Sequence, residues 1–471
     1  MFTNNYSRKF LLSVTALFLI GIITVISNSQ IVEGQMMSHN GEMSHDGSNL
    51  PQNKAEEIQS PLKQIWQGIF LSEVECKSGQ VLLIDSKMKN SACVSPQTAK
   101  KLVVRSWGIQ SSELPLSEDN EIKVDHIVEK ITTECGKDID CTIDSLNNIA
   151  ADEKKFIVLR TSTDIAGIYQ SKGSCHGFGH HLGMFLYDYV DNLPESLFYA
   201  NQLCGGSQYH GIIERFFDKN IVGTDPEKIN ITAICPESVD NSFAWERWQC
   251  IHGIGHGLDK FYNYDIFSAL EKCDELDLKF EEISCSKGVF MENIEKFLES
   301  KEGNFDKTDI FFPCDAIDSK YVPACYNFQS TYIRSQPNYS IEYAFETCDM
   351  IEPKEFVQYC YSGIGRIYAG NSANDFENAI TVCKTGDTNY QKYCFTGVLL
   401  ALVNNYSLDK GFEYCKFLPL EFKENCYDGI GKWIIMLHSL PEQREKECSK
   451  AENADYSRIC TNASLDNMTL L

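Results

Sequence analysis

The sequence is poor in basic residues, with 42 Lys and Arg against 66 Asp and Glu, which gives a formal net charge of -24. Proteins that bind nucleic acid or an anionic membrane surface need a positive surface, so this balance argues against both kinds of partner. We expect a partner that is cationic, neutral or bridged by a metal ion. The same negative charge keeps the chain soluble and attracts cations.

Familiar catalytic signatures are also missing from the sequence. It contains no recognisable Ser/His/Asp order, no phosphate-binding loop, no Cys-x-x-Cys pair and no dinucleotide fingerprint. No segment after the N-terminal region is apolar enough to span a membrane. These absences exclude the commonest enzyme classes and leave the histidines as the main source of chemistry.

The N-terminal region predicts export. Residues 1–29 begin with Arg8 and Lys9, continue through an apolar stretch from Phe10 to Ile26, and end in small polar residues. This pattern is typical of a secretory signal, and the apolar stretch also approaches the length of a membrane anchor. The even number of cysteines, 20, indicates disulfides and an oxidising compartment. We therefore expect an extracellular or cell-surface protein, which meets a membrane only if the N-terminal segment is uncleaved.

Residues 30–60 form a polar, aperiodic segment that predicts a flexible linker. Met-Ser-His occurs twice in it, at residues 37–39 and 43–45. Thioether and imidazole groups suit copper, particularly Cu(I). The alternative is a disordered polar stretch that happens to contain two histidines.

Residues 61–112 predict a small α+β module. QVLLID is an alternating strand, ACV a returning strand, and a helix follows the cap at Ser95. Cys76 and Cys93 are placed to staple this hairpin. The module resembles a short cysteine-pair module of exported archaeal proteins, and we expect a structural or adhesive appendage.

After a helical lead-in at residues 113–165, the sequence repeats. Segments that begin Cys-x-x-Gly and continue with helical apolar spacing recur about every 35 residues. In one unit CYSGIGRIYAG is the first helix, NSAND the loop and FENAITVCK the second helix. We predict a mainly α fold, a disulfide-stapled α-solenoid of about eight helical hairpins over residues 166–465 with a tail at 466–471.

A glycine occupies a fixed place in the first helix of these units. Glycine costs about 1 kcal/mol relative to alanine inside a helix, so its recurrence indicates close approach of neighbouring helices. Phe328 takes this place in one unit. The repeat glycines are Gly177, Gly211, Gly253, Gly288, Gly363, Gly397 and Gly429.

The cysteines predict a staple at most junctions between units, because the end of one second helix lies a short loop before the next first helix. Loops this short are worth roughly 2–3 kcal/mol each in the chain-entropy model. Elimination leaves Cys175–Cys204 and Cys135–Cys141. The predicted junction pairs are Cys235–Cys250, Cys273–Cys285, Cys314–Cys325, Cys348–Cys360, Cys383–Cys394, Cys415–Cys426 and Cys448–Cys460.

The array resembles tetratricopeptide-related helical-hairpin solenoids of the secreted, cysteine-rich kind, although the usual Leu-Gly-x-x-Tyr signature is not kept. Three blocks add a closer likeness: CHGFGHHLG (175–183), YHGIIERF (209–216) followed by CIHGIGHG (250–257), and CSKGVFMENI (285–294). In this order they resemble a family of exported bacterial and archaeal proteins of unassigned function. The resemblance implies the repeat fold and brings no activity with it.

The positions one before and three after the repeat glycine form two columns. Three consecutive units carry His176 and His180, His210 and Glu214, and His252 and His256 there, whereas later units carry Lys287 and Met291 or Ser362 and Arg366. A spacing of four puts both members of a pair on one helical face, and neighbouring helices pack about 8–10 Å apart. We predict these six residues as ligands of zinc, copper or iron, all of which suit imidazole with a carboxylate.

An alternative stays open, in which the imidazoles only pack against aromatic neighbours with one hydrogen bond each. In a gently curved row the outer helices of three stand too far apart for all six ligands to converge, so the metal hypothesis needs a tight turn. His181 lies outside the columns, and we expect it at the surface or behind the ligands.

Two functions fit these features. The first is a secreted or surface-anchored metal-binding scaffold that binds a protein or small ligand on the solenoid face. The second is a metal-dependent hydrolase or oxidoreductase, in which Glu214 completes the ligand set or acts as general base. We favour the scaffold because repeat arrays mostly bind. A catalytic site would keep an open coordination position and a cleft.

Overall fold

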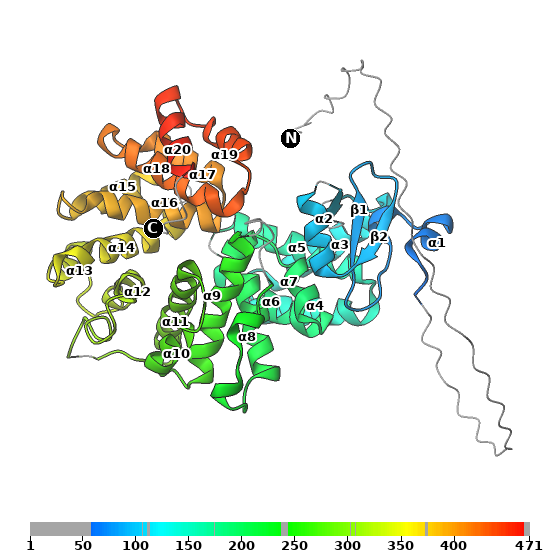
Figure 1. Cartoon of the computed structure of the whole chain (residues 1–471), viewed down its shortest axis with the longest axis horizontal. Coiled ribbons are helices and arrows are strands. Elements are labelled where there is room, and N and C mark those ends of the chain that lie inside the picture. The colour runs from blue at the N-terminus through cyan, green and yellow to red at the C-terminus, as the bar shows by residue number, and fades with distance from the viewer. Residues whose placement is uncertain are drawn as a thin grey trace, which may run out of the picture. The chain divides into compact units, whose positions relative to one another are not determined.

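The computed structural model describes residues 58–465, apart from 106, 111–113, 174, 237–243, 302, 307 and 373–374 (Figure 1). The predicted signal or anchor at residues 1–29, both Met-Ser-His triplets and the tail at 466–471 lie outside the described residues. Most described residues are helical and one small sheet is present, which confirms the mainly α prediction. None of the helices in the described part of the chain has the length and apolar character needed to cross a membrane.

The sheet belongs to the small module. Strands β1 (Val81–Asp85) and β2 (Ser91–Val94) form the predicted antiparallel hairpin, and the Cys76–Cys93 disulfide ties its approach to β2. Strand β3 (Gly108–Gln110) pairs with the other edge of β1 and was not predicted, because three residues are too few to show alternation. The flanking helices are α1 (Pro61–Trp66) and α2 (Pro96–Val104).

The rest of the described chain is built from helices, in which one helix of each repeat unit forms a continuous row. The lead-in helices are α3 (Glu118–Cys135), α4 (Ile139–Asp152) and α5 (Lys155–Ser171). The row of first helices is α6 (His176–Val190), α8 (Ser207–Asn220), α9 (Ala244–Phe261), α11 (Lys279–Ser300), α12 (Val322–Arg334), α14 (Val357–Ser372), α16 (Gln391–Asn405), α18 (Leu420–Leu437) and finally α20 (Ala454–Leu465).

Six units have the predicted second helix. Two do not, because within the described residues α8 is followed only by short 3₁₀ turns and α11 only by irregular turns. These connections contain Pro226 and Pro313, which remove a backbone donor and disfavour a continued helix. The second helices are α7 (Leu193–Tyr199), α10 (Ile266–Cys273), α13 (Ile341–Asp349), α15 (Phe376–Thr385), α17 (Leu408–Phe417) and α19 (Pro441–Cys448).

All twenty cysteines are paired, and every predicted pair is formed. The seven junction bridges each connect the end of one unit to the first helix of the next, including Cys235–Cys250 despite its longer loop. Cys135–Cys141 and Cys175–Cys204, inferred by elimination, are also present. Ten bridges in one chain indicate an oxidising, extracellular environment.

Successive helices of the row approach at glycines, as predicted for most units. A Cβ atom at Gly211 would lie 1.9 Å from the carbonyl oxygen of His180, and one at Gly288 would lie 2.0 Å from that of His252. Gly177 is the exception, since a Cβ atom there would meet nothing within 4 Å. The glycines therefore allow α6 to pack on α8, and α9 on α11, closer than side chains would permit.

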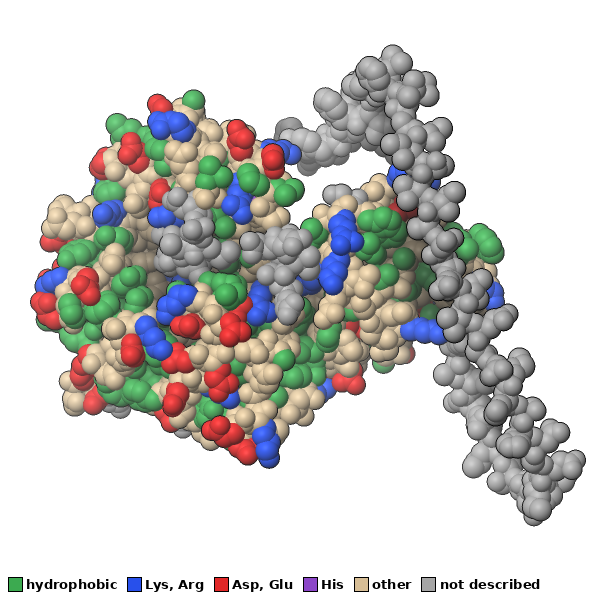
Figure 2. All heavy atoms as spheres, in the orientation of Figure 1, with side chains coloured by type: hydrophobic (Ala, Val, Ile, Leu, Met, Phe, Trp, Pro, Cys, Tyr) green, Lys and Arg blue, Asp and Glu red, His purple; other side chains and the backbone are tan. Residues whose placement is uncertain are grey.

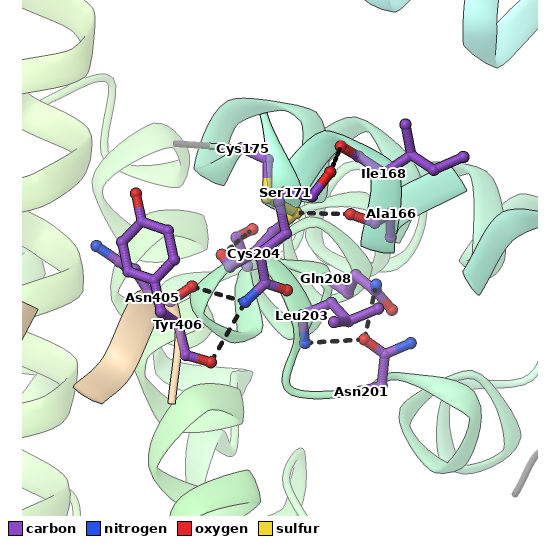
Figure 3. The surroundings of a disulfide bond; sticks show 12 residues. Ala166, Ile168, Ser171, Cys175, Asn201, Leu203, Cys204, Gln208, Asn405 and Tyr406 are labelled. Carbon is purple, nitrogen blue, oxygen red and sulfur yellow. Dashed lines mark hydrogen bonds between the residues drawn. A yellow bond between two sulfur atoms is a disulfide. The ribbon is translucent and has the colours of Figure 1, made fainter. Parts of the chain in front are cut away.

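The row of first helices turns back on itself. Each helix packs on the next, and in addition α16 contacts the 3₁₀ turn at Leu203–Gly206 while α18 contacts α9 (Figure 1). The Gln170 side chain donates to the carbonyl oxygen of Asn405 at 2.9 Å, and the Gln249 amide donates to Asn404 Oδ1 at 3.2 Å. Figure 3 shows Asn405 and Tyr406 beside the turn that carries Cys204. We call Gln170, Gln249, Asn404 and Asn405 the closing contact.

Candidate metal centre

The six residues predicted as ligands come together on α6, α8 and α9. The imidazole centroids of His180 and His210 are 5.1 Å apart, those of His210 and His252 4.6 Å, and those of His180 and His256 5.0 Å. The tight packing at the glycines is what brings the outer two helices within reach of each other. His181 points away and is exposed.

Three ring nitrogens converge on one point. His180 Nε2 lies 3.1 Å from His176 Nε2 and 3.3 Å from His210 Nδ1. Neighbouring nitrogens in a tetrahedral zinc site lie about 3.3 Å apart, as follows from Zn–N bonds of about 2.0–2.1 Å. His180 therefore stands at this spacing from both His176 and His210, and the three residues offer nitrogens within 4.8 Å of one another.

The outer hydrogen bonds fix which nitrogens carry protons. His180 Nδ1 donates to Glu214 Oε1 at 2.6 Å, and His210 Nε2 donates to Gln249 Oε1 at 2.9 Å, because each oxygen can only accept. In the neutral rings this leaves His180 Nε2 and His210 Nδ1 without hydrogen, so two lone pairs face each other at 3.3 Å. A proton or a metal ion between them removes this repulsion.

A second set of ligands overlaps the first. His256 Nδ1 lies 2.9 Å from Glu292 Oε2, while its Nε2 is buried without a hydrogen-bond partner in the described part of the structure. His252 Nδ1 donates to the carbonyl oxygen of Ser284 at 3.2 Å, which leaves its Nε2 bare and 3.4 Å from Met291 Sδ. His210, His252 and His256 offer nitrogens within 4.8 Å of one another.

Carboxylates surround the imidazoles. Glu214 accepts from His180 and from Lys260 Nζ at 2.5 Å, so both of its oxygens are engaged. Glu295 can join His180 and His256 as a ligand, and Glu292 can join Glu214 and His256. A carboxylate that accepts from a histidine orients the ring and raises its basicity toward a metal, which is the position of Glu214 behind His180.

The protonation of the cluster reflects first the burial of its groups and then the charges of their neighbours. Burial raises the pKa of Glu292 to about 8 against the attraction of Lys260, with a smaller contribution from the repulsion of Glu214, and burial also raises the pKa of Glu295. Burial alone would lower the pKa of His180, but Glu214 raises it to about 9. Burial followed by the charge of His180 lowers the pKa of His176 to about 3. A metal cation would stabilise the ionised carboxylates and the neutral imidazoles together.

The centre opens on a cavity of about 460 Å³ that the row of first helices surrounds. His176, His210 and His252 form one wall of it, whereas Glu214 is not among the lining residues. Side chains from α11, α12, α14, α16 and α18 form the other walls, so residues from most of the row face the same space. The arrangement can hold a metal ion with an open coordination position toward a bound molecule.

Sequence reasoning missed Glu292, Glu295, Lys260 and Gln249. Glu292 and Glu295 follow Met291 by one and four residues, so they lie near the columns, and their closeness to a histidine-bearing block was the available signal. Gln249 and Lys260 lie at helical spacing from His252 and His256 on α9. Their roles depend on which neighbouring helix they face, and a single helix pattern does not contain that information.

In comparisons with known proteins, no family model, no curated protein and no solved structure matches the chain.

Proposed function

We propose that the chain is an exported metal-binding protein, in which a disulfide-stapled α-solenoid holds a divalent transition-metal ion on His176, His180 and His210 beside a ligand-binding cavity. The carrying observation is that His180 Nε2 and His210 Nδ1 face each other at 3.3 Å while Glu214 and Gln249 hold the outer nitrogens of the two rings, so that a proton or a metal ion must lie between them. Zinc, copper and iron all accept this donor set.

The contacts favour metal binding over simple packing of the imidazoles. Packed histidines would each be satisfied by one hydrogen bond to a neutral neighbour, and their remaining nitrogens would be directed apart or toward donors. Here five rings place nitrogens toward one another, and the outer nitrogens of His180 and His210 are held by Glu214 and Gln249. This is the pattern of ligands with orienting partners behind them.

The position of the centre favours a ligand-binding role. A purely structural metal site is closed, whereas this one borders a cavity. The same observation supports a second candidate, a metal-dependent hydrolase or oxidoreductase. In that case Glu295, which lines the cavity, is better placed to act as general base than Glu214, whose oxygens are held by His180 and Lys260.

Elemental analysis of the secreted protein, followed by titration of the metal-free form with Zn(II), Cu(II) and Fe(II), tests the proposal. The adjacent substitutions His180→Ala and His181→Ala form a matched pair, because His180 is buried in the cluster and His181 is exposed. We expect His180→Ala to weaken metal binding at least ten-fold and to abolish the rise in thermal midpoint that metal gives the parent. Equal affinity and stoichiometry in both variants would mean that the histidines are packing residues.

The enzyme candidate needs a separate measurement. It predicts turnover by the metal-loaded protein that chelation removes and that Glu295→Gln reduces while metal stays bound. Model esters and hydrogen peroxide are suitable first substrates for the hydrolase and oxidoreductase versions.

A further inference from the structure

Beyond the histidines, the same repeat columns bring two cations into the cavity. Lys287 on α11 occupies the column of His176, His210 and His252, and Arg366 on α14 occupies the column of His180 and His256. Both side chains line the cavity, together with His176, His210 and His252. The face that carries the metal centre in the early units therefore carries positive charge in the later ones.

Neither cation is neutralised by an ion pair within the described residues. The Lys287 ammonium lies over the Trp248 ring, 5.4 Å from its centroid. The Arg366 guanidinium lies over the Phe328 ring at 4.5 Å. Neutral oxygens accept the hydrogen bonds of Arg366, since Nε donates to Asn327 Oδ1 at 3.1 Å and Nη2 to Thr331 Oγ1 at 3.0 Å. Aromatic faces and amides stabilise a cation in place without cancelling its charge.

The two cations repel each other in a partly dry space. Burial lowers the pKa of Lys287 to about 8, and the charge of Arg366 lowers it further. Burial likewise lowers the pKa of Arg366 to about 10, against the attraction of Glu295. Glu295 also lines the cavity, and its charge interacts with His180 and Lys260 in the cluster. A metal ion that recruits Glu295 would remove the attraction of this carboxylate for Arg366.

We propose that the cavity binds a small molecule bearing a carboxylate or phosphate, with its anionic group between Lys287 and Arg366 and its body against Trp248, Phe328 and Trp433. All five residues line the same cavity, and about 460 Å³ accommodates a molecule of metabolite size. His176, His210 and His252 line the same cavity, so a molecule bound there lies beside the candidate metal centre. This assignment rests on the proposed function, which places a ligand in this cavity. The anion is held by Lys287 and Arg366, so the protein should bind it with or without metal.

The acidic surface does not contradict an anionic ligand. Figure 2 shows acidic and basic side chains interspersed over the face in view, with no single-sign patch. Charges at the surface are screened beyond about 8–10 Å in physiological salt, whereas Lys287 and Arg366 act on a ligand at contact distance. The enclosing helices exclude a polyanion such as DNA and admit a small one.

Isothermal titration of the full secreted chain with inorganic phosphate and with acetate tests the proposal, in both metal-free and metal-loaded forms. The variants are Lys287→Met and Arg366→Gln, and the controls are Lys279→Met, exposed on the same helix, and the exposed Arg458→Gln. We expect at least one probe to bind the metal-free parent, and each cavity variant to weaken that binding at least ten-fold while the controls match the parent. Preference between phosphate and acetate distinguishes the two ligand groups.

Two results would overturn the anion site. One is equal affinity in Lys287→Met and Lys279→Met. The other is anion binding that appears only in the metal-loaded protein and survives both cavity substitutions, because the anion would then coordinate the metal. Metal titration of Lys287→Met separates the proposals: retained metal with lost anion binding supports both, and anion binding in a chain that takes up no metal supports the cavity site alone. Unchanged thermal midpoints in the variants verify that they fold.

Discussion

Replacing Gly211 by alanine tests the close packing that brings the histidines of the candidate metal centre together. A Cβ atom at this position would lie 1.9 Å from the carbonyl oxygen of His180 and 2.7 Å from its carbonyl carbon. Ordinary Cβ contacts begin near 3.4 Å, and 3.4 − 1.9 = 1.5 Å, so α6 and α8 must separate by that amount at the crossing. The obstacle is backbone, which does not rotate away as a side chain would.

The cost has two opposing parts. Overpacking of a fitted interface costs about 1–3 kcal/mol, and the better helix propensity of alanine returns about 1 kcal/mol. We expect a net loss of about 1–2 kcal/mol in the free energy of unfolding. The effect on metal is larger in relative terms, because the 3.3 Å gap between His180 Nε2 and His210 Nδ1 spans this crossing. Widening it should lower metal affinity at least ten-fold.

Urea unfolding with the disulfides intact and zinc titration measure the two effects. The control is Gly177→Ala, at the same repeat position, where a Cβ atom would have no neighbour within 4 Å. We expect this control to keep metal affinity and to be as stable as the parent or up to about 1 kcal/mol more stable. If Gly211→Ala matched Gly177→Ala in both measurements, close helix approach would not be what positions the histidines.

Three further predictions use other features. Neither carboxylate oxygen of the buried Asp259 has a hydrogen-bond partner in the described structure, and burial raises its pKa well above 3.8. Asp259→Asn should therefore add about 1–3 kcal/mol to the free energy of unfolding at pH 7. The gain should shrink as the pH falls toward 3.8, because the folded chain takes up the proton first and the unfolded chain does so only near 3.8, and urea curves at high and low pH would reveal its absence. Because the pKa of His176 is lowered from 6.5 to about 3, the neutral ring stabilises the fold above pH 6.5, and this stabilisation is lost as the pH falls toward 3. The metal-free protein should therefore lose thermal stability on acidification. A thermal midpoint that rises instead would contradict this. Replacing both Cys383 and Cys394 by alanine should cost roughly 2–3 kcal/mol, and unchanged urea midpoints would show that the staple is dispensable.

The local parts of the fold were predictable because they depend on residues that are close together in the sequence. The cysteine pairs lie a short loop apart, and the hairpin in the small module shows alternation followed by a helix cap at Ser95. The two missing second helices were also within reach, since Pro226 and Pro313 interrupt the segments where they were expected. The expectation of close helix approach was wrong at Gly177, which occupies the repeat position although no neighbouring atom would contact a side chain there.

The long-range parts were not predictable from one sequence. The closing contact joins Gln170 to Asn405 and Gln249 to Asn404, which are far apart in the chain, and no local pattern sets the curvature that brings them together. That curvature decides whether three helices converge on one ion. The net charge of -24 also gave no hint of a basic site, because it sums over the whole chain and does not show that the fold places Lys287 and Arg366 in one cavity.

The disulfides link neighbouring units along the row, but none of them links the two ends of the row at the closing contact. The widest disulfide spans 29 residues, so none of the ten bridges crosses the closing contact, which depends on side-chain amide hydrogen bonds that water can replace. Gln249 belongs both to the closing contact and to the candidate metal centre, since its nitrogen donates to Asn404 and its oxygen accepts from His210. Any separation of Gln249 from Asn404 would therefore also disturb the hydrogen bond that orients His210. If a metal ion binds at the candidate centre, its hold on His210 would also fix Gln249 and, through it, the contact with Asn404.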